Sequence, residues 1–271
     1  MTEKKIEKYL EEYQEILNKF QKWISTQSHL PQDIPKIVLI RYLQVYDFDI
    51  EKAKELLEIN VRIRNKNQYI FTNRDINSEE IQRALNTVQV TSFPKLTKEK
   101  YHISGFRLIN FDSHNFVTND VVKYILMFQD MLNVKSPMTR GDMCIFDAKG
   151  LTIWHLMKMV SGVNAIRLFM RYVQEAAALR LMQNHFVNCS TVLMKVISFL
   201  KPFMKKELSD VMHFHTSGFE SLHEFIPKEY LPVEYDGTEE SLDDYSKKTV
   251  SNLHDLRDYL IKDENFFIAN E

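Results

Sequence analysis

Apolar residues between positions 3 and 26 recur at steps of three and four, with glutamates and lysines filling the positions between them. This spacing predicts one amphipathic helix. A two-stranded coiled coil is the alternative interpretation. Because Pro31 and Pro35 end the pattern after about three heptads, packing of this helix within its own domain is favoured.

Similar spacing continues to residue 85. It predicts a helix over residues 37–45. It also predicts a second helix, whose apolar residues lie between positions 53 and 63. Asp49 stands just before the latter, where its carboxylate can accept the free backbone N–H groups of the first turn. A further short helix is predicted within residues 77–85. The first part of the chain is therefore expected to be entirely helical.

Farther along, the pattern changes to short apolar runs separated by helical stretches. Alternation predicts a strand over residues 107–111, and further strand candidates lie at 143–146, 185–187 and 211–214. Helical spacing occurs between them, at about 118–133, 152–177 and 191–205. Strands that alternate with helices of this length predict βαβ units. The expected fold class is α/β with a mainly parallel sheet, preceded by a small helical domain.

Composition narrows the functional classes. Hydrophobic residues make up 44% and charged residues 27% of the 271 positions, which is typical of a soluble globular protein. With a net charge of −2, no nucleic-acid partner is expected. The chain has 6 glycines and none of the glycine-rich phosphate-binding motifs, so no cofactor is expected.

Cysteine content and apolar run length suggest a cellular location. Cys144 and Cys189 are too few for a disulfide framework and are interpreted as buried free thiols in a reducing compartment. No run approaches the ~18 apolar residues of a membrane span. A cytoplasmic protein is therefore predicted, with transient and peripheral contact to membranes.

Residues with catalytic or metal-binding potential do not form a known motif. His213 and His215 would share one face of a strand, with His223 nearby, but partners at zinc-ligand spacing are missing. Asp147 ends a predicted strand, where α/β folds place ligands; the alternative is a helix cap or loop anchor ahead of Gly150. We therefore predict no metal site and no enzymatic activity.

The predicted helix near residues 191–205 is apolar on nearly all sides, more than one buried face requires. Such a helix is either wholly buried or covers an apolar molecule that comes and goes. Basic residues lie before it and at its end. They form either a solvated surface or contacts with anionic lipid headgroups, worth roughly 1 kcal/mol each; the candidates are Arg180, Lys201, Lys205 and Lys206.

An ordered set of segments resembles the CRAL-TRIO (Sec14-like) family, and most of all its branch of tocopherol-transfer and retinaldehyde-binding proteins. The segments are LIRYL (39–43), FDIEKA (48–53), residues 97–112, CIFDAKG (144–150), WHL (154–156), FVN (186–188), KPF (201–203) and IPKEYLPVEY (226–235). The resemblance spans about residues 36–238.

This resemblance implies three regions: a helical N-terminal domain (1–77), a lipid-binding domain (78–245) and a C-terminal helical tail (246–271). It further implies a sheet as the pocket floor and a mobile lid helix over roughly 190–204. Residues expected to line the ligand pocket are Tyr124, Phe128, Phe146, Leu151, Trp154, Phe169, Val173, Leu181, Leu193 and Ile197. Those assigned to the lid are Val192, Val196, Phe199, Leu200 and Phe203.

One departure from the family pattern concerns a turn. The family's Leu-Pro-x-Glu-Tyr run is usually followed by two glycines, whereas here Asp236 takes the first place and Gly237 the second. We expect the turn to be kept, because aspartate adopts left-handed backbone more readily than most residues.

The resemblance implies a monomeric carrier that binds a hydrophobic lipid and exchanges it at membrane surfaces. Tocopherol-like, retinoid and carotenoid ligands, as well as sterols and fatty acyl chains, all fit this description. The alternative hypothesis is an interaction or signalling module switched by lipid occupancy, in which the helix over residues 3–26 docks a partner. An esterase is the least favoured class, because no nucleophile with a base can be assembled from the sequence.

Overall fold

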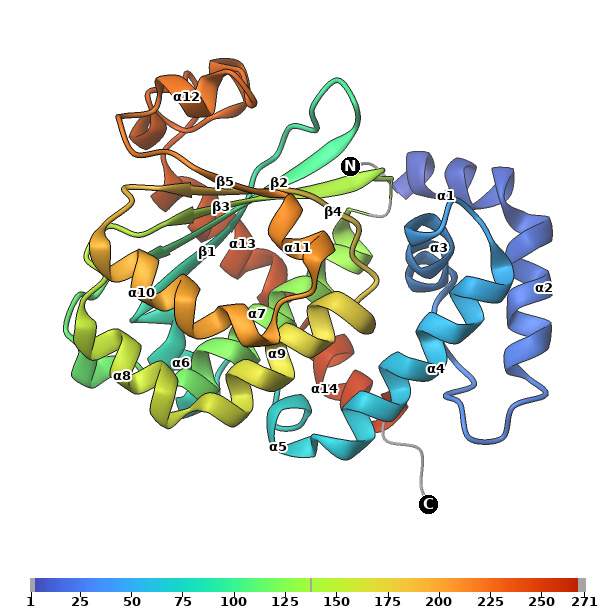
Figure 1. Cartoon of the computed structure of the whole chain (residues 1–271). Helices are drawn as coiled ribbons and strands as arrows, with labels where there is room; N and C mark the ends of the chain where they lie inside the picture. Colours follow the sequence, from blue (N-terminus) through green and yellow to red (C-terminus); the bar gives the residue numbers. More distant parts are fainter. Residues whose placement is uncertain (1–2, 137, 268–271) are drawn as a thin grey trace.

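The computed structural model describes residues 3–136 and 138–267 (Figure 1). Helices alone form its first part, as the spacing predicted. They are α1 (Glu3–Glu12), α2 (Gln14–Ile24), α3 (Lys36–Val45), α4 (Ile50–Lys66), α5 (Gln68–Phe71) and α6 (Glu79–Leu85). Asp49 caps α4 as expected: its carboxylate accepts the backbone N–H groups of Glu51 and Lys52 at 3.1 and 3.2 Å.

The prediction of one continuous helix over residues 3–26 is wrong. The chain breaks at Tyr13, whose backbone has φ −109° and ψ 16°. The Tyr13 ring stacks on Phe48 with centroids 4.3 Å apart and meets Tyr9 edge-on at 5.1 Å. Since the apolar spacing continues across the break, periodicity alone could not reveal it.

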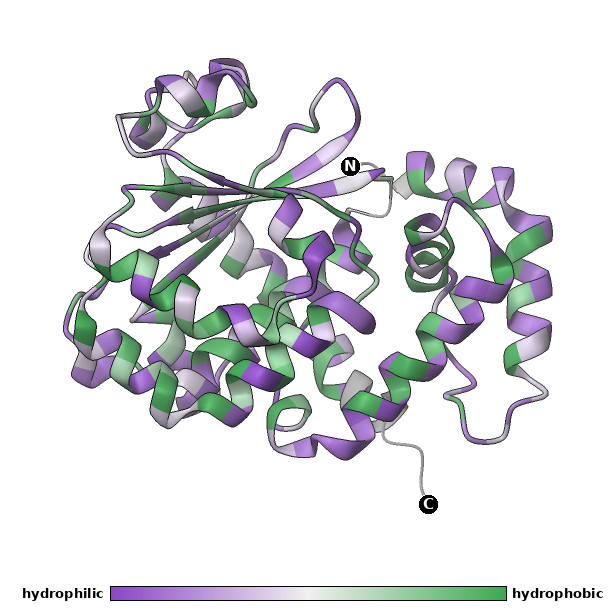
Figure 2. Cartoon of the chain, viewed as in Figure 1, coloured by the Kyte–Doolittle hydropathy of each residue, from purple (hydrophilic) through white to green (hydrophobic). Residues whose placement is uncertain are grey.

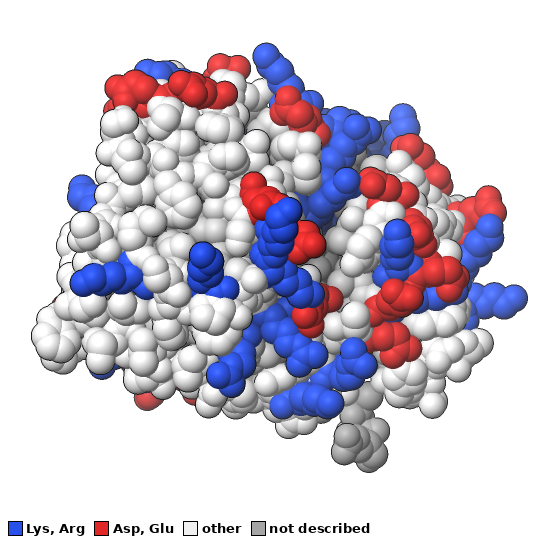
Figure 3. All heavy atoms as spheres, in the orientation of Figure 1, with Lys and Arg blue, Asp and Glu red and all other residues white. Residues whose placement is uncertain are grey.

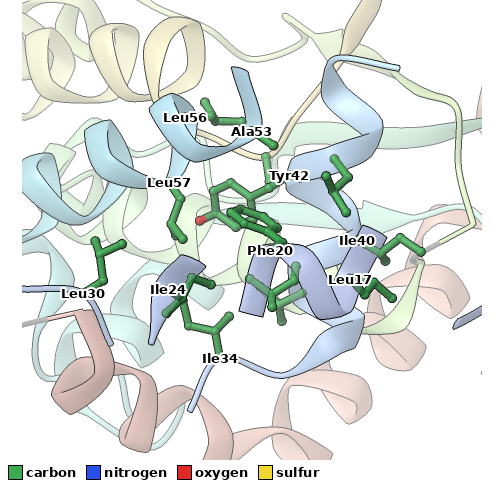
Figure 4. Packing of buried hydrophobic residues seen from close by; sticks show 14 of the residues in the cluster. Leu17, Phe20, Ile24, Leu30, Ile34, Ile40, Tyr42, Ala53, Leu56 and Leu57 are labelled. Carbon is green, nitrogen blue, oxygen red and sulfur yellow. The ribbon is translucent and has the colours of Figure 1, made fainter. Parts of the chain in front are cut away.

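The N-terminal helices α2, α3 and α4 share one core, seen in close-up in Figure 4. Leu17 and Phe20 on α2 pack with Tyr42 on α3 and Leu57 on α4, and all four side chains are buried. Packing within the chain therefore accounts for the apolar face of α2, which is the interpretation that the sequence favoured over a coiled coil.

The described residues form a sheet of five strands, in the order β1 (Val88–Ser92), β2 (Tyr101–Leu108), β3 (Gly141–Asp147), β4 (Leu181–Val187) and β5 (Met212–Phe214). Neighbours from β2 to β5 are parallel, and β1 pairs antiparallel with β2. The prediction of a mainly parallel α/β sheet is confirmed.

One strand prediction is wrong. The strand expected over residues 107–111 ends at Leu108, and β1 was not predicted at all. The backbone N–H groups of Ile109 and Asn110 both donate to the Thr87 carbonyl, at 3.0 and 3.2 Å. These two hydrogen bonds to one carbonyl end the pairing of β2 with β1. The alternation of apolar and polar residues over 109–111 therefore lies outside the sheet.

The remaining helices follow the sheet strands. They are α7 (Thr118–Lys135), α8 (Ile153–Ser161), α9 (Val163–Glu175), α10 (Thr191–Leu200), α11 (Lys206–Asp210), α12 (Glu220–His223), α13 (Leu242–Asp255) and α14 (Arg257–Phe267). Short 3-10 turns lie at Ser113–Asn115, Lys201–Phe203, Lys228–Tyr230 and Val233–Tyr235. Two of the helical stretches predicted from the sequence, 152–177 and 191–205, are therefore not single helices over their whole length.

The stretch 152–177 is two helices that meet at Gly162, and the stretch 191–205 is α10 followed by a 3-10 turn. A Cβ atom at Gly162 would lie 2.5 Å from the Thr118 side chain. Thr118 in turn donates a hydrogen bond of 2.9 Å to the Lys158 carbonyl. The glycine thus lets the α8–α9 joint close onto the start of α7.

The two faces of the sheet carry different layers. Helices α8, α9 and α10 lie on one side of the sheet, and α12 lies on the other (Figure 1). On the α12 side, Ile103 and Ile145 join a buried cluster with Leu222 and Tyr235. On the other side, hydrophobic residues recur along α8 and α10 (Figure 2).

The turn after the last 3-10 segment agrees with the expectation from its sequence. Asp236 adopts a left-handed conformation with φ 55° and ψ 27°. A Cβ atom at Gly237 would lie 1.9 Å from the Leu231 carbonyl oxygen. Aspartate is therefore accommodated at the first position, whereas the second position requires glycine because the backbone approaches so closely.

Candidate functional site

An apolar cavity of about 300 Å³ lies between the sheet and helices α7, α9 and α10. Phe106 and Phe146 line it from the strands, Ile125 from α7, Val173 from α9 and Ile197 from α10. Its volume is at the lower end of the range of small-molecule pockets, roughly 300–1,000 Å³. Its lining suits a hydrophobic guest, since removal of apolar surface from water drives such binding.

A row of stacked phenylalanines forms the cavity floor. The parallel register places Phe106, Phe146, Phe186 and Phe214 side by side on β2 to β5. Successive ring centroids are 4.7, 5.3 and 5.0 Å apart, with interplanar angles of 15° to 16°. The first three line the cavity. The floor is therefore flat, aromatic and continuous across three strands.

Helix α10 forms the roof. Its N-cap Ser190 accepts a hydrogen bond of 3.2 Å from the Leu193 backbone N–H. Leu193 is 5% exposed and faces the cavity, whereas its neighbour Met194 is 51% exposed on the other side. The excess of apolar residues in this helix thus serves two surfaces, one inside and one outside.

Seven of the predicted pocket residues meet at this cavity: Phe146, Leu151, Phe169, Val173, Leu181, Leu193 and Ile197. Two of the predicted lid residues, Val196 and Leu200, line it as well. Their contact with a ligand stays a prediction.

Three predicted pocket residues do not line the cavity. Tyr124 and Phe128 on α7 are buried in the core with β1, because they lie on a different face of α7 from the lining residue Ile125. Phe128 packs edge-on against the floor residue Phe106, with ring centroids 5.9 Å apart, but does not itself line the cavity. Trp154 is 67% exposed, whereas the next residue on α8, His155, is buried. Because neighbouring residues of a helix point in different directions, burial of His155 turns Trp154 toward the surface.

The predicted lid helix ends earlier than expected, because Phe203 lies beyond the end of α10. Val192 and Phe199 lie on α10 but do not line the cavity, and their role in a lid stays a prediction. Phe199 and Phe203 pack instead on the cluster around α9, where the Arg167 guanidinium lies 5.6 Å from the Phe203 ring centroid. The chain after α10 is therefore tied to α9 by aromatic packing.

Sequence reasoning missed several polar residues of the cavity, among them Cys144 and Asn184 on the strands that form its floor. Each lies two positions before a floor phenylalanine on its strand, so the period-two rule could have found both. Burial raises the pKa of the Cys144 thiol, with a further contribution from Asp142. Cys144 and Cys189 are both free thiols, as predicted, but each residue is partly exposed and not fully buried.

The candidate catalytic residues have other roles in the structure. Asp147 accepts hydrogen bonds from the Asn188 side-chain amide (2.7 Å) and the Lys149 backbone N–H (2.9 Å), which matches a loop anchor. On the sheet face opposite the phenylalanine row, His185 Nδ1 lies 3.0 Å from His215 Nε2. Burial lowers the pKa of His185 to about 3, with His215 and His213 adding to the effect. Within residues 3–136 and 138–267, no group of three potential ligands could hold a metal ion.

The predicted headgroup contacts are mostly engaged with carboxylates. Arg180 pairs with Asp47 at 2.5 Å, Lys205 with Glu175 at 2.9 Å and Lys206 with Asp210 at 3.7 Å. Lys201 is exposed at the end of α10. These pairs lie at or near the surface, so they do not prevent exchange for another anion.

Exposed apolar side chains of α8 and α10 gather on the molecule's surface. We call Ile153, Trp154, Met157 and Val160 on α8, with Met194 on α10, the α8–α10 patch. The surface over these helices is largely uncharged, with scattered Lys and Arg (Figure 3). No described helix is long and apolar enough to cross a membrane.

A second hollow, of about 510 Å³, is open to solvent near α5 and the start of α9. Its lining is mixed: Asn67, Asn164, Arg167 and Arg171 lie beside Tyr69 and Leu168. In an open hollow, a guest must compete with water for the polar groups of the lining. The apolar cavity is therefore the stronger candidate site.

The fold and the cavity define an α/β protein with an apolar cavity beneath a surface helix. A family model described as "CRAL/TRIO domain" matches residues 86–237, and one described as "Pinta-like, UBA domain" matches residues 9–81. The chain belongs to the CRAL/TRIO family, so the resemblance drawn from its sequence is confirmed.

Curated relatives point to the same branch. The chain is 23% identical over 223 residues to an alpha-tocopherol transfer protein-like protein of Mus musculus, a match that covers 82% of this chain and 64% of the relative. It is 25% identical over 206 residues to Clavesin-1 of Rattus norvegicus, covering 74% and 56%. The matched part therefore spans less than two thirds of either relative.

A crystal structure of Sfh5 is similar along nearly the whole chain. The TM-score is 0.50 at 16% identity, with 92% of this chain and 97% of that chain covered. At this identity the likeness shows the fold alone.

Proposed function

We propose that this protein binds one hydrophobic small molecule in the cavity beneath α10 and carries it between membranes. The observation that carries the proposal is the apolar cavity beneath α10 with its phenylalanine floor. Burying about 400 Å² of apolar ligand surface would contribute ~10 kcal/mol before ordering costs. Transfer out of water is then the whole mechanism, and the proposal includes no catalytic step.

Helix α10 is proposed as the lid. It contributes Leu193, Val196 and Ile197 to the cavity, so moving it would open the chamber on one side. Its two ends lie beside turns, at the Ser190 cap and at the 3-10 turn Lys201–Phe203. Such short segments can absorb the backbone changes that a hinged helix needs.

The α8–α10 patch is proposed as the membrane-facing surface. Its apolar side chains would enter the headgroup region, while nearby Lys195 and Lys201 would face anionic lipid. Because the patch includes the outer side of the proposed lid, membrane contact and lid opening would occur at the same place. Transient docking of a cytoplasmic monomer fits this arrangement.

Two neighbouring residues of α10 provide a matched test of cavity and membrane surface. Leu193→Asp would place a carboxylate in the apolar cavity and abolish ligand loading. Met194→Asp, on the exposed side, would leave loading intact and weaken vesicle binding. Native mass spectrometry and solvent extraction of the purified proteins would measure ligand content, and vesicle flotation would measure binding.

Equal ligand content in wild type and Leu193→Asp would contradict the cavity assignment. Retained loading without transfer between vesicles, together with one stoichiometric protein partner, would instead support the occupancy-switched interaction module. The two outcomes are separable because ligand content, lipid transfer between vesicles and binding of a protein partner are three independent measurements.

A further inference from the structure

The Asn184 side chain sits in the apolar cavity without a hydrogen-bond partner. Asn184 is 7% exposed and lines the cavity from β4. Its backbone N–H donates to the Val211 carbonyl at 2.7 Å, but its side-chain Oδ1 is buried and unpaired. A buried polar atom without a partner costs stability, so its presence calls for an explanation.

Most other polar side chains around the cavity are engaged. Arg107 donates to Gln89 at 2.5 Å and to Asp243 at 2.7 Å. Thr118 donates to the Lys158 carbonyl, and Asp147 accepts from Asn188. Asn184 therefore differs from these neighbours in having hydrogen-bonding capacity left for a guest.

The surroundings of Asn184 indicate which guest would use that capacity. The register aligns it with Cys144 on β3 and Met212 on β5, two weakly polar sulfur side chains that also line the cavity. The phenylalanine row begins two residues further along the same strands. A ligand could thus place a polar head at Asn184 and its apolar body over Phe146 and Phe186.

Charge argues against an ionised head. The guanidinium of Arg107 is the cation among the cavity-lining residues, and it already faces Asp243 at 2.7 Å and Glu234 at 3.8 Å. A carboxylate or phosphate in the cavity would be desolvated without a free counter-charge. A neutral hydroxyl group meets the need, because its O–H can donate to Asn184 Oδ1.

We infer that Asn184 is the polar anchor of the cavity and selects lipids that carry a neutral hydroxyl group, that is, lipid alcohols or phenols. This inference rests on the proposed function and narrows its ligand class. Pure hydrocarbons would leave Asn184 unpaired, and fatty acids would bring a buried charge.

Matched lipids test the inference. Wild-type protein loaded with a fluorescent apolar reporter is titrated with 1-hexadecanol, hexadecyl methyl ether and palmitate. We expect 1-hexadecanol to displace the reporter at a concentration about ten- to a hundredfold lower than the ether, because the ether cannot donate to Asn184. Palmitate is expected to compete less well than the alcohol at pH 8.

Variants then assign the preference to one side chain. Asn184→Leu should bind alcohol and ether equally and unfold at the same or a higher urea concentration. Met182→Leu, two positions earlier on β4 and outside the cavity lining, should keep the wild-type preference.

Equal binding of alcohol and ether by wild type, or a preserved preference in Asn184→Leu, would overturn the anchor while leaving the carrier proposal intact. Failure of the reporter and of every lipid to bind would overturn the proposed function, and the anchor with it.

Discussion

Arg64 on α4 donates a hydrogen bond of 2.6 Å to the Asp130 carboxylate on α7, and both side chains are buried. The other carboxylate oxygen of Asp130 accepts from Arg74. Burial opposes ionisation of Asp130, but the two guanidinium groups outweigh it and lower the pKa of that carboxyl. The pair joins the N-terminal helices to the helix that forms one wall of the cavity.

Removing this carboxylate is expected to destabilise the whole chain. Asp130→Asn would remove the negative charge that both buried guanidinium groups contact, which costs about 3–5 kcal/mol of unfolding free energy. Urea unfolding followed by circular dichroism measures the change. The control is Asp255→Asn, which breaks the exposed 3.4 Å pair with Lys135 and should cost under about 1 kcal/mol. Equal effects of the two variants would show that the buried cluster is not needed for stability.

Helix and strand types were largely predictable, because burial on one side imposes a period that the sequence displays. The capped helix after Asp49 and the strands around Phe146 and Phe186 were found in this way. The break at Tyr13 was not predictable, since it depends on stacking with Phe48 across the domain. Strand β1 was missed because it is held by antiparallel pairing with β2, a tertiary relationship.

The candidate site was predictable only in part, for a similar reason. Family resemblance located Phe146, Val173 and Leu193, whose positions follow from the shared fold. It also placed Trp154 in the pocket, whereas the rotation of α8 turns that side chain to the surface. Asn184 escaped notice because a polar residue in an apolar cavity runs against the pattern used to find it.

Acid is expected to destabilise the fold through buried histidines, above all His102 and His185. Burial lowers the pKa of His102 to about 4, against the opposing effect of the Asp142 carboxylate 3.9 Å away, and lowers that of His185 to about 3. Below pH ~6.5 the unfolded chain binds protons at these residues and the folded chain does not. Stability therefore falls as pH decreases from 6.5 toward 4, by up to about 1.4 kcal/mol per pH unit for each histidine.

Unfolding free energies at pH 7.5, 6.5 and 5.5 test this slope. His185→Gln is the matched variant and should reduce the pH dependence, because one buried histidine with a lowered pKa is removed. His155 and His215, whose pKa values are also lowered by burial, keep a share of the slope. An unchanged slope would mean that other groups control acid stability.

Filling the cavity should block loading without unfolding the protein. Val173 on α9 lines the cavity, so Val173→Trp would place an indole where the ligand is proposed to lie. Overpacking of this kind costs about 1–3 kcal/mol, which a domain of this size tolerates. Native mass spectrometry should find the variant without ligand. Val160→Trp, on the exposed face of α8, is the control and should stay loaded; ligand retained by both variants would place the binding site elsewhere.

Trp154 provides a direct optical test of the α8–α10 patch. The chain has two tryptophans, and Trp23 lies in the N-terminal core region, packed against Phe20. In Trp23→Phe, the emission of Trp154 should shift to shorter wavelength when phosphatidylcholine–phosphatidylserine vesicles are added.

Trp154→Ala should weaken vesicle binding roughly tenfold or more, since burying a large apolar side chain contributes about 1.5–3 kcal/mol. Trp154→Phe should retain most of the binding, and ligand content should be the same in all three. If the emission does not shift while vesicles still bind the protein, the membrane-facing surface lies away from α8.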